Sequence, residues 1–331
     1  MKALFIARPG ETELGSVPRP VPGPDEVCVR VCHVGFCGSD LASYRGLNPL
    51  VSYPRIPGHE VSGFVGEAAV VVVPYTSCGA CAACSAGRPN ACQRNQTLGV
   101  QRDGALVEEL VVPANKVLTS HELGPRELVL VEPLAVGWHA ARRGRVAAGD
   151  VVAVFGCGMV GLGAITAAAA QGAAVIAIDV DDRKLGLARA AGAETGVNSR
   201  TENLHQRLQT LTDGHGPRVA VEAVGLPETF RACVDEVCFA GRVVYVGYAR
   251  QPVEYETRVF VQKELDIVGS RNATAEDFAQ VSQHLASRRF PVDAAITRTV
   301  TLEQAGRALA EWDRDPAATT RIVVEISPCS S

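Results

Sequence analysis

Four cysteines lie close together in the first third of the chain. Cys78, Cys81, Cys84 and Cys92 are separated by two, two and seven residues in the stretch CGACAACSAGRPNAC. Four thiolates at this spacing can surround one tetrahedral zinc ion at about 2.3 Å and close its coordination shell, which is typical of a structural site. An iron–sulfur cluster and four unrelated thiols are the alternative interpretations. We expect structural zinc.

A second set of possible ligands is scattered along the chain. Cys37 occurs in GFCGSD, His59 and Glu60 occur in PRIPGHE, and Glu132 occurs in VEPLAVGWHA. Each residue alone is more often a core or surface side chain than a ligand. Together they offer the sulfur, nitrogen and oxygen ligands of a catalytic zinc, in which three protein ligands leave one position for an alcohol. Either Glu60 or Glu132 can complete the set, and the two can alternate.

A glycine motif follows a predicted strand. Gly156, Gly158 and Gly161 form GxGxxG in VAVFGCGMVGLG, and Asp179 follows 18 residues after the last glycine, at the end of AVIAID. The glycines allow a tight turn and close approach to a pyrophosphate, and the carboxylate can accept hydrogen bonds from ribose hydroxyls. The alternative is a strand, turn and helix that bind no nucleotide. We expect a dinucleotide site.

The acidic residue bears on the choice of cofactor. A carboxylate at Asp179 would repel the 2′-phosphate of NADP, so the sequence favours NAD. Arg183 and Lys184 lie close enough along the chain to assist a phosphate, which weakens this preference.

The elements that position these residues differ between the two parts of the chain. Alternating Val27, Val29 and Val31 begin an irregular β-rich part that contains the cysteines. After Gly149, runs such as VVAVF, AVIAI, RVAVEAV, RVVYVG and LDIVG alternate with alanine-rich stretches, which predicts parallel strands joined by helices. Further helices are expected at 132–145 and 302–312, and a further strand at 321–326.

The totals narrow the classes of protein. With 331 residues, two domains are expected. A net charge of -4, from 32 basic and 36 acidic residues, argues against a nucleic-acid or anionic membrane partner. The start MKALFIARPG lacks a signal-peptide core, so we expect a cytoplasmic protein with reduced cysteines. The apolar stretch 155–178 contains five glycines, and we interpret it as strand, helix and strand rather than a membrane span.

The order of these motifs resembles the zinc-containing medium-chain dehydrogenase/reductase family over nearly the whole chain. The GHE and EPLAVG elements are similar to the polyol branch, which includes sorbitol and threonine dehydrogenases. The stretches SYPRIPGHE, VVPYTSCGACAACSAGRPNAC and VGSRNATAEDFAQV are similar to bacterial dehydrogenases that oxidise C5 of L-galactonate or L-gulonate.

The resemblance implies an α/β fold. A GroES-like β-rich catalytic domain at 1–146 and 288–331 would flank a Rossmann domain, a doubly wound parallel sheet, at 147–287. It also implies Cys37, His59 and Glu132 as catalytic zinc ligands, with Glu60 as an alternate or adjacent ligand. Ser39 matches the hydroxyl that begins the proton relay, although a turn serine is an equal alternative.

Strand ends are where cofactor contacts gather in such folds. We therefore expect cofactor contacts at Gly156, Gly158, Met159, Val160, Gly161, Asp179, Arg183, Val224, Gly225, Val246, Gly247, Ser270 and Arg271. Arg271 could instead clamp a substrate carboxylate with two parallel hydrogen bonds, or be a surface arginine without a role.

Two departures from the family pattern concern the catalytic part. Leu41 and Ala42 follow Asp40, where several polyol-branch relatives carry a histidine that shuttles protons. The segment between Glu60 and Cys78 is about 15 residues shorter than in relatives, because either a hairpin is trimmed or residues are missing from the sequence.

The function expected is oxidation of a secondary alcohol of a polyol or sugar acid to a ketone, with hydride transfer to NAD and two zinc ions per chain. A secondary-alcohol or cyclitol dehydrogenase is the alternative within the same mechanism. A nucleotide-binding or quinone reductase-like protein that has lost zinc is the alternative from another class. The resemblance implies a homodimer or homotetramer.

Overall fold

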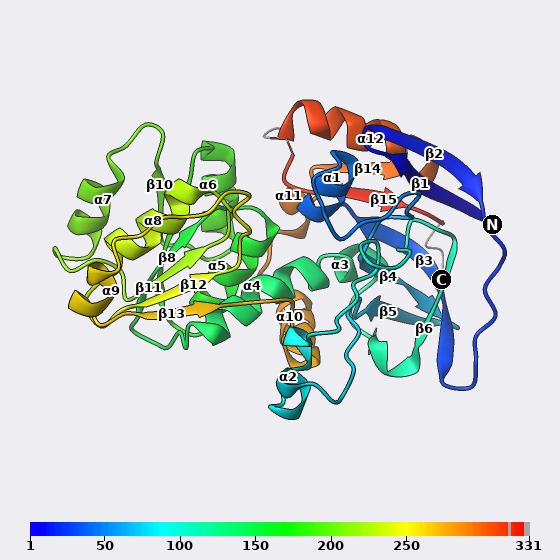
Figure 1. Ribbon diagram of the computed structural model, residues 1–331, viewed down its shortest axis with the longest axis horizontal. Coiled ribbons are helices and arrows are strands. Elements are labelled where there is room, and N and C mark those ends of the chain that lie inside the picture. The colour runs from blue at the N-terminus through cyan, green and yellow to red at the C-terminus, as the bar shows by residue number, and fades with distance from the viewer. Residues whose placement is uncertain (317–318, 328–331) are drawn as a thin grey trace. The chain divides into compact units, whose positions relative to one another are not determined.

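The computed structural model describes residues 1–316 and 319–327, and contacts between Cα atoms divide the chain into two units. Unit 1 comprises residues 1–132, 274–287 and 292–331, and unit 2 comprises residues 133–273 and 288–291. Figure 1 shows a β-rich unit and a unit in which helices surround a sheet. The mixed α/β class expected from the sequence is confirmed.

Unit 1 is built on a sheet of seven strands in the order β14-β15-β3-β4-β5-β7, with β6 also paired to β3. A separate hairpin pairs β1 with β2. Its strands are β1 (Lys2–Arg8), β2 (Glu11–Ser16), β3 (Glu26–Gly35), β4 (Glu60–Val65), β5 (Ala68–Val72), β6 (Glu109–Pro113), β7 (Val117–Ser120), β14 (Arg298–Thr301) and β15 (Ile322–Glu325). Its helices are α1 (Gly38–Tyr44), α2 (Ala82–Ser85), η1 (Pro89–Ala91), η2 (Ala114–Lys116), α3 (Pro125–Leu128), α10 (Ala275–Ala286), α11 (Val292–Ala295) and α12 (Leu302–Arg314).

The shortened segment of unit 1 closes as a tight hairpin. Val65 at the end of β4 pairs with Ala68 at the start of β5, so Gly66 and Glu67 form the turn. Gly66 has φ +59°, in the left-handed region that glycine occupies without steric cost. The chain as given therefore continues the antiparallel sheet through this turn.

Unit 2 contains a parallel sheet in the order β10-β9-β8-β11-β12-β13. The strands are β8 (Val151–Phe155), β9 (Ala174–Asp179), β10 (Thr195–Asn198), β11 (Val219–Glu222), β12 (Arg242–Tyr245) and β13 (Asp266–Gly269). The helices are α5 (Met159–Ala170), α6 (Asp182–Ala190), α7 (Leu204–Leu211), α8 (Pro227–Glu236) and α9 (Arg258–Gln262), while α4 (Val131–Arg143) enters from unit 1. The strand order reverses between β8 and β11, which is where ligands bind in such sheets.

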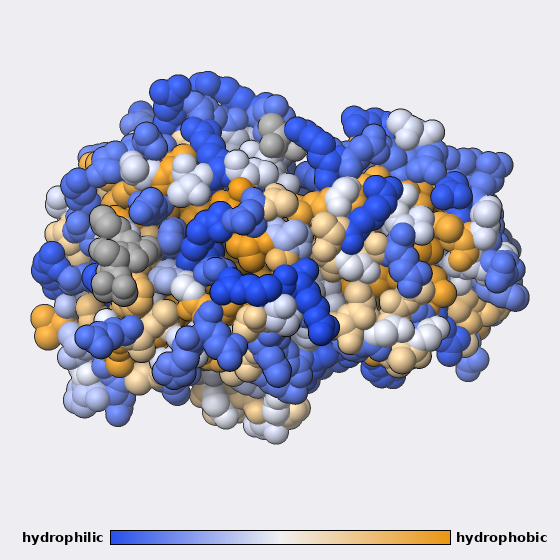
Figure 2. Space-filling model, turned by 180° about the vertical axis from the view of Figure 1, so that it is seen from behind, coloured by the Kyte–Doolittle hydropathy of each residue, from blue (hydrophilic) through white to orange (hydrophobic). Residues whose placement is uncertain are grey.

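The apolar stretch 155–178 is strand, helix and strand, as expected from its glycines. A Cβ atom on Gly163 of α5 would lie 2.3 Å from the carbonyl oxygen of Leu134, and one on Gly137 of α4 would lie 2.0 Å from that of Val160. The small residues therefore let the α4 and α5 backbones touch. Within residues 1–316 and 319–327, no helix has the length and apolarity needed to span a membrane. On the face shown in Figure 2, hydrophilic side chains are interspersed with apolar ones.

One helix falls on the other side of the expected domain boundary. Helix α10 groups with unit 1, whereas the resemblance predicts that all of 147–287 belongs to the Rossmann domain. Phe278 of α10 packs edge-to-face on Tyr75, with ring centroids 6.5 Å apart. Residues 133–143 of α4 group with unit 2, because the glycine contacts above join α4 to α5.

Candidate active site

The four cysteines of the 78–92 segment come together around α2 and η1. The sulfur atoms of Cys81 and Cys84 lie 3.6 Å apart, those of Cys81 and Cys92 3.8 Å, and those of Cys78 and Cys92 3.6 Å. The edge of a zinc–sulfur tetrahedron with bonds of about 2.3 Å is about 3.8 Å long. The four thiols can therefore hold one tetrahedral ion, and their spacing is too long for disulfides.

Proton affinities within this cluster are unequal. Hydrogen bonds from the backbone N–H groups of Cys84 and Gln93 lower the pKa of Cys81 to about 6. Desolvation and the neighbouring thiols raise the pKa of Cys84 to about 11. Crowding four thiols favours only partial ionisation, and a cation would be needed to hold all four as thiolates.

Three of the scattered candidates form a second cluster in unit 1. Cys37 precedes α1, His59 precedes β4 and Glu60 begins it, and one ligand atom from each lies within 4.8 Å of the other two. His59 Nδ1 and Glu60 Oε1 are buried and have no hydrogen-bond partner among the described residues. Buried polar atoms are rarely left unsatisfied, so these orphaned atoms and the mixed donor set fit a metal ion.

Asp40 connects the two loops that carry these ligands. Its carboxylate accepts a hydrogen bond from the Cys37 backbone N–H at 2.8 Å and another from the Gly58 N–H at 3.0 Å. Gly58 has φ +98°, and a Cβ atom there would lie 2.7 Å from Val34. Asp40 therefore fixes the backbone on both sides of the cluster.

Arg321 contacts Glu60 at Oε2, one of its two carboxylate oxygens. Its guanidinium pairs with Glu60 Oε2 and donates to the carbonyl of Phe36 at 2.6 Å. The side chains of Arg321 and Glu60 are 5% and 0% exposed. Burial opposes ionisation of Arg321, but the carboxylate of Glu60 keeps the arginine pKa above its usual value. The pair leaves Oε1 of Glu60 available to a metal.

Glu132 lies beside this cluster but outside the three-residue group. Its carboxylate accepts a hydrogen bond from the hydroxyl of Tyr75, which is itself buried. Burial raises the pKa of Glu132 to about 7, and burial together with Glu132 raises the pKa of Tyr75 well above its usual value. Tyr75 therefore remains a donor that orients Glu132.

The acidic groups around His59 change its pKa. Burial alone would lower the pKa of His59, but the Cys37 thiol, Asp40 and Glu132 raise it well above the usual value. Three acidic groups facing one imidazole create a site that favours positive charge. A divalent cation satisfies this demand in the same way as a proton.

Ser39 lies in the first turn of α1, two residues after Cys37. Its hydroxyl is buried and has no hydrogen-bond partner among the described residues, while its backbone carbonyl accepts from Ser43 Oγ at 2.8 Å. The capping alternative therefore gains no support from a hydroxyl contact.

The glycine motif forms the turn between β8 and α5. Gly156 has φ +93°, and Gly158 precedes the first residues of the helix, Met159 and Val160. A Cβ atom on Gly161 would lie 1.8 Å from the carbonyl oxygen of Gly156, so only glycine fits there. At Gly158, a Cβ atom would meet nothing within 4 Å, which leaves open space over the helix N-terminus.

The other predicted cofactor residues follow the carboxyl ends of β11, β12 and β13. Glu222 is buried at the end of β11, and its Oε1 accepts from the N–H groups of Val224 at 2.9 Å and Gly225 at 2.8 Å. Its backbone carbonyl accepts from the N–H groups of Val246 at 3.0 Å and Gly247 at 3.2 Å. One glutamate therefore organises two of the predicted turns.

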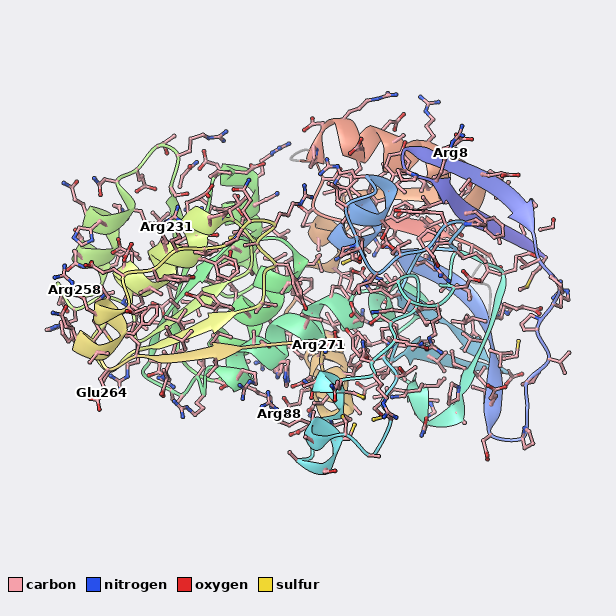
Figure 3. All side chains as sticks on the ribbon, in the orientation of Figure 1. Arg8, Arg88, Arg231, Arg258, Glu264 and Arg271 are labelled. Atoms are coloured by element: carbon pink, nitrogen blue, oxygen red, sulfur yellow. The ribbon has the colours of Figure 1, made fainter. Side chains whose placement is uncertain are left out.

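The turn after β13 carries the last two candidates. The backbone N–H of Ser270 donates to the Tyr245 carbonyl at 2.9 Å, while its side-chain hydroxyl is buried without a partner among the described residues. Arg271 is exposed on unit 2, in the position labelled in Figure 3.

Sequence reasoning missed four residues at these sites, namely Asp40, Tyr75, Glu222 and Arg321. The only signal for Asp40 in the sequence is its place in the GSD triplet after Cys37. Glu222 and Arg321 share a detectable signal, because each is a charged residue at one end of a short apolar run, VAV before Glu222 and IVV after Arg321. Tyr75 has no such signal, since a tyrosine after a strand is common.

Family comparisons agree with this arrangement. Residues 23–122 match the alcohol dehydrogenase GroES-like domain, and residues 159–287 match the zinc-binding dehydrogenase family. L-galactonate-5-dehydrogenase of Escherichia coli strain K12 is 32% identical over 308 residues, which cover 90% of this chain and 91% of that protein. Sorbitol dehydrogenase of Bacillus subtilis strain 168 is 32% identical over 327 residues, covering 93% and 92%.

Solved structures of similar fold include complexes with both nicotinamide cofactors. A short chain alcohol dehydrogenase of E. coli CFT073 complexed with NADH has a TM-score of 0.89 at 29% identity, covering 98% of this chain and 99% of that one. A zinc-binding dehydrogenase of Sinorhizobium meliloti 1021 bound to NADP has a TM-score of 0.90 at 27% identity, covering 98% and 99%. Galactitol-1-phosphate dehydrogenase of Escherichia coli has a TM-score of 0.91 at 27% identity, covering 98% and 100%.

Two matching domains and curated dehydrogenase relatives that align along nearly the whole chain show the same ancestry. The chain belongs to the zinc-containing medium-chain dehydrogenase/reductase family of oxidoreductases.

Proposed function

We propose that the protein oxidises a secondary alcohol of a polyol or sugar acid to a ketone and transfers the hydride to NAD. The observation that carries this proposal is the convergence of Cys37, His59 and Glu60, whose ligand atoms lie within 4.8 Å of one another. A zinc ion held there would act as a Lewis acid towards the substrate hydroxyl. The four cysteines at 78–92 would hold a second, structural zinc.

The residues around the metal group suit proton removal. The hydroxyl of Ser39 is two residues from Cys37 and has no partner among the described residues, so it can accept the alcohol proton and pass it on. Tyr75 holds Glu132 in place through a hydrogen bond, and Arg321 holds Glu60 in place through an ion pair. Asp179 would bind the adenosine ribose hydroxyls of NAD.

Substrate preference is assigned to Arg271. The L-galactonate and sorbitol dehydrogenases are each 32% identical to this chain, so percentage identity does not separate a sugar-acid substrate from a polyol. A carboxylate in the substrate is the feature that distinguishes the two. A guanidinium binds a carboxylate through two parallel hydrogen bonds. A cyclitol or simple secondary alcohol would make no use of this residue. A homodimer or homotetramer and a cytoplasmic location stay predictions.

The test measures NAD reduction by zinc-replete protein with aldonates, polyols, cyclitols and simple secondary alcohols, alongside zinc content. We expect turnover with a six-carbon aldonate and about two zinc ions per chain. Cys37→Ser should abolish turnover, while Cys28→Ser, a half-buried cysteine outside both metal groups, should retain it. Full turnover by Cys37→Ser would instead support the alternative that this protein works without a catalytic zinc ion.

The role of Arg271 has its own matched control. Arg231 is also an exposed arginine of unit 2, on α8, and both residues are labelled in Figure 3. Arg271→Ala should raise the KM for a sugar acid by about tenfold or more, as expected for a lost hydrogen bond to a charged group. Arg231→Ala should leave this KM unchanged. Turnover only with uncharged polyols would remove the carboxylate role.

A further inference from the structure

The carboxyl end of β9 holds Asp179 in one fixed orientation. Its Oδ2 accepts from the N–H of Cys157 in the glycine turn at 2.8 Å. Its Oδ1 accepts from the N–H groups of Val180 at 2.7 Å and Asp181 at 3.1 Å. A carboxylate offers about four lone-pair sites, so these three donors leave about one for a ribose hydroxyl. A 2′-phosphate has no proton to donate to it at neutral pH.

Arg183, which the sequence places close enough to assist a phosphate, is engaged elsewhere. Its Nη2 donates to Asp181 Oδ2 at 2.9 Å, and its Nε donates to Asp181 Oδ1 at 3.3 Å. The side chain of Asp181 is only 15% exposed, whereas that of Arg183 is 74% exposed. The hydrogen bonds from Arg183 lower the pKa of Asp181 to about 2, so the pair is charged throughout the neutral range.

The local charges reinforce this pairing. Residues 179–184 contain three aspartates against one arginine and one lysine. Arg200, which follows β10, donates to the carbonyl of Val180 at the same end of the sheet. Both guanidinium groups near Asp179 thus have acceptors supplied by the protein itself.

We propose that Asp181 is a specificity-determining residue for the cofactor, because its pairing with Arg183 keeps that guanidinium from binding the 2′-phosphate of NADP. This inference rests on the proposed use of NAD. Asp179 supplies a contact to the ribose of NAD, and Asp181 withholds the guanidinium contact that Arg183 could make to the 2′-phosphate of NADP. The preference for NAD then depends on two carboxylates with different tasks.

A purely structural role for Asp181 predicts a different outcome. Asp181 is also the N-cap of α6, where its Oδ1 accepts from the Arg183 N–H at 2.8 Å. Asparagine caps helices about as well as aspartate, so Asp181→Asn removes the charge and keeps the cap. Asp182→Asn is the matched control, because it removes one negative charge from the same helical turn without touching the partner of Arg183. Asp182 instead accepts from Asn198 Nδ2 at 2.8 Å.

The experiment measures binding by titration calorimetry of NAD, NADP, AMP and adenosine 2′,5′-bisphosphate to the zinc-replete variants. In Asp181→Asn, the affinity for the two 2′-phosphorylated ligands should rise by about tenfold, the low end for a hydrogen bond between charged groups at an exposed site. Affinity for NAD and AMP should change by less than about threefold, within the spread of such measurements. Adding Arg183→Gln should abolish the gain, and Asp182→Asn should not produce it.

Each contrary result has a distinct meaning. If Asp181→Asn retains NAD binding and its melting temperature but gains nothing for NADP, the inference is overturned. An equal gain in Asp182→Asn also overturns it, because general charge repulsion would then explain the effect. If the unaltered protein binds NADP as tightly as NAD, the proposed NAD function fails first, and this inference fails with it.

Discussion

Arg321 and Glu60 form a buried ion pair across Gly35 of the strand between them. The two residues are 261 positions apart in the sequence, and β15, β3 and β4 lie side by side in the sheet. A Cβ atom on Gly35 would lie 2.2 Å from Glu60 Oε2 and 3.3 Å from Arg321 Nη1. Because Gly35 has no side chain, Arg321 and Glu60 can contact each other across this strand. The pair holds Glu60, a proposed metal ligand, in place.

Removing one member of this pair should be costly. In Arg321→Met, the Glu60 carboxylate would remain fully buried without its counter-charge, which typically costs about 3–5 kcal/mol. Urea unfolding should show this loss, and zinc analysis should show weaker retention of the ion at Cys37, His59 and Glu60. Arg321→Met combined with Glu60→Gln removes both charges of the pair and should recover part of the stability. Unchanged unfolding of Arg321→Met would show that the pair contributes little.

The glycine motif separates a packing role from a cofactor role. Gly161→Ala places a Cβ atom 1.8 Å from the Gly156 carbonyl oxygen, so it should lower the melting temperature. Gly158→Ala meets no protein atom within 4 Å and should leave the melting temperature unchanged. Its Cβ would nevertheless occupy the space over the helix N-terminus, and the dissociation constant for NAD should rise at least about tenfold because the pyrophosphate needs close backbone approach. Unaltered NAD binding by Gly158→Ala would place the pyrophosphate elsewhere.

Zinc binding at the four-cysteine cluster should depend on pH. A zinc ion must displace the protons of thiols such as Cys84, whose pKa is raised to about 11, whereas Cys81, with its pKa lowered to about 6, is already ionised at neutral pH. As pH rises, fewer protons need to be displaced, so affinity should increase from pH 6 to pH 9. Chelator competition with Cys37→Ser, which isolates this cluster, measures the effect. Affinity independent of pH would show that the thiols are already deprotonated.

The proton count offers a control for that measurement. Calorimetry in two buffers of different ionisation enthalpy should report protons released on zinc binding near neutral pH, and the number of protons should fall as pH rises.

Cys157 should not react in a thiol-labelling experiment. Cys157 is fully buried and its pKa is raised by that burial, so it should resist alkylation with or without zinc.

Much of the fold was accessible from local sequence patterns. The run VVAVF corresponds to β8 over the same five residues, AVIAI covers β9 except Asp179, and the other three β-branched runs each contain one strand. The sixth strand of the parallel sheet, β10, lies outside these runs. The expected helix at 132–145 is α4 at Val131–Arg143, and that at 302–312 is α12 at Leu302–Arg314. Periodicity and glycine placement act over a few residues, so the chain itself carries this information.

The two candidate metal sites differ in how far apart their residues lie in the sequence. Cys78, Cys81, Cys84 and Cys92 lie within one short segment, so their spacing alone limits how far apart the sulfur atoms can be. Cys37 is 22 residues from His59, and only the pairing of β3 with β4 brings the two loops together.

The sequence by itself predicted most strands of the parallel sheet, the glycine turn and the residue types of the candidate metal sites, because each depends on neighbours along the chain. Only the tertiary structure decided which acceptor each charged side chain meets. The register of β15 against β3 and of β3 against β4 brings Arg321 to Glu60. The fold of unit 1 brings Tyr75 to Glu132, and the first turn of α6 directs Arg183 to Asp181. Such pairings depend on side-chain direction and burial in three dimensions, which residue type and spacing leave unspecified.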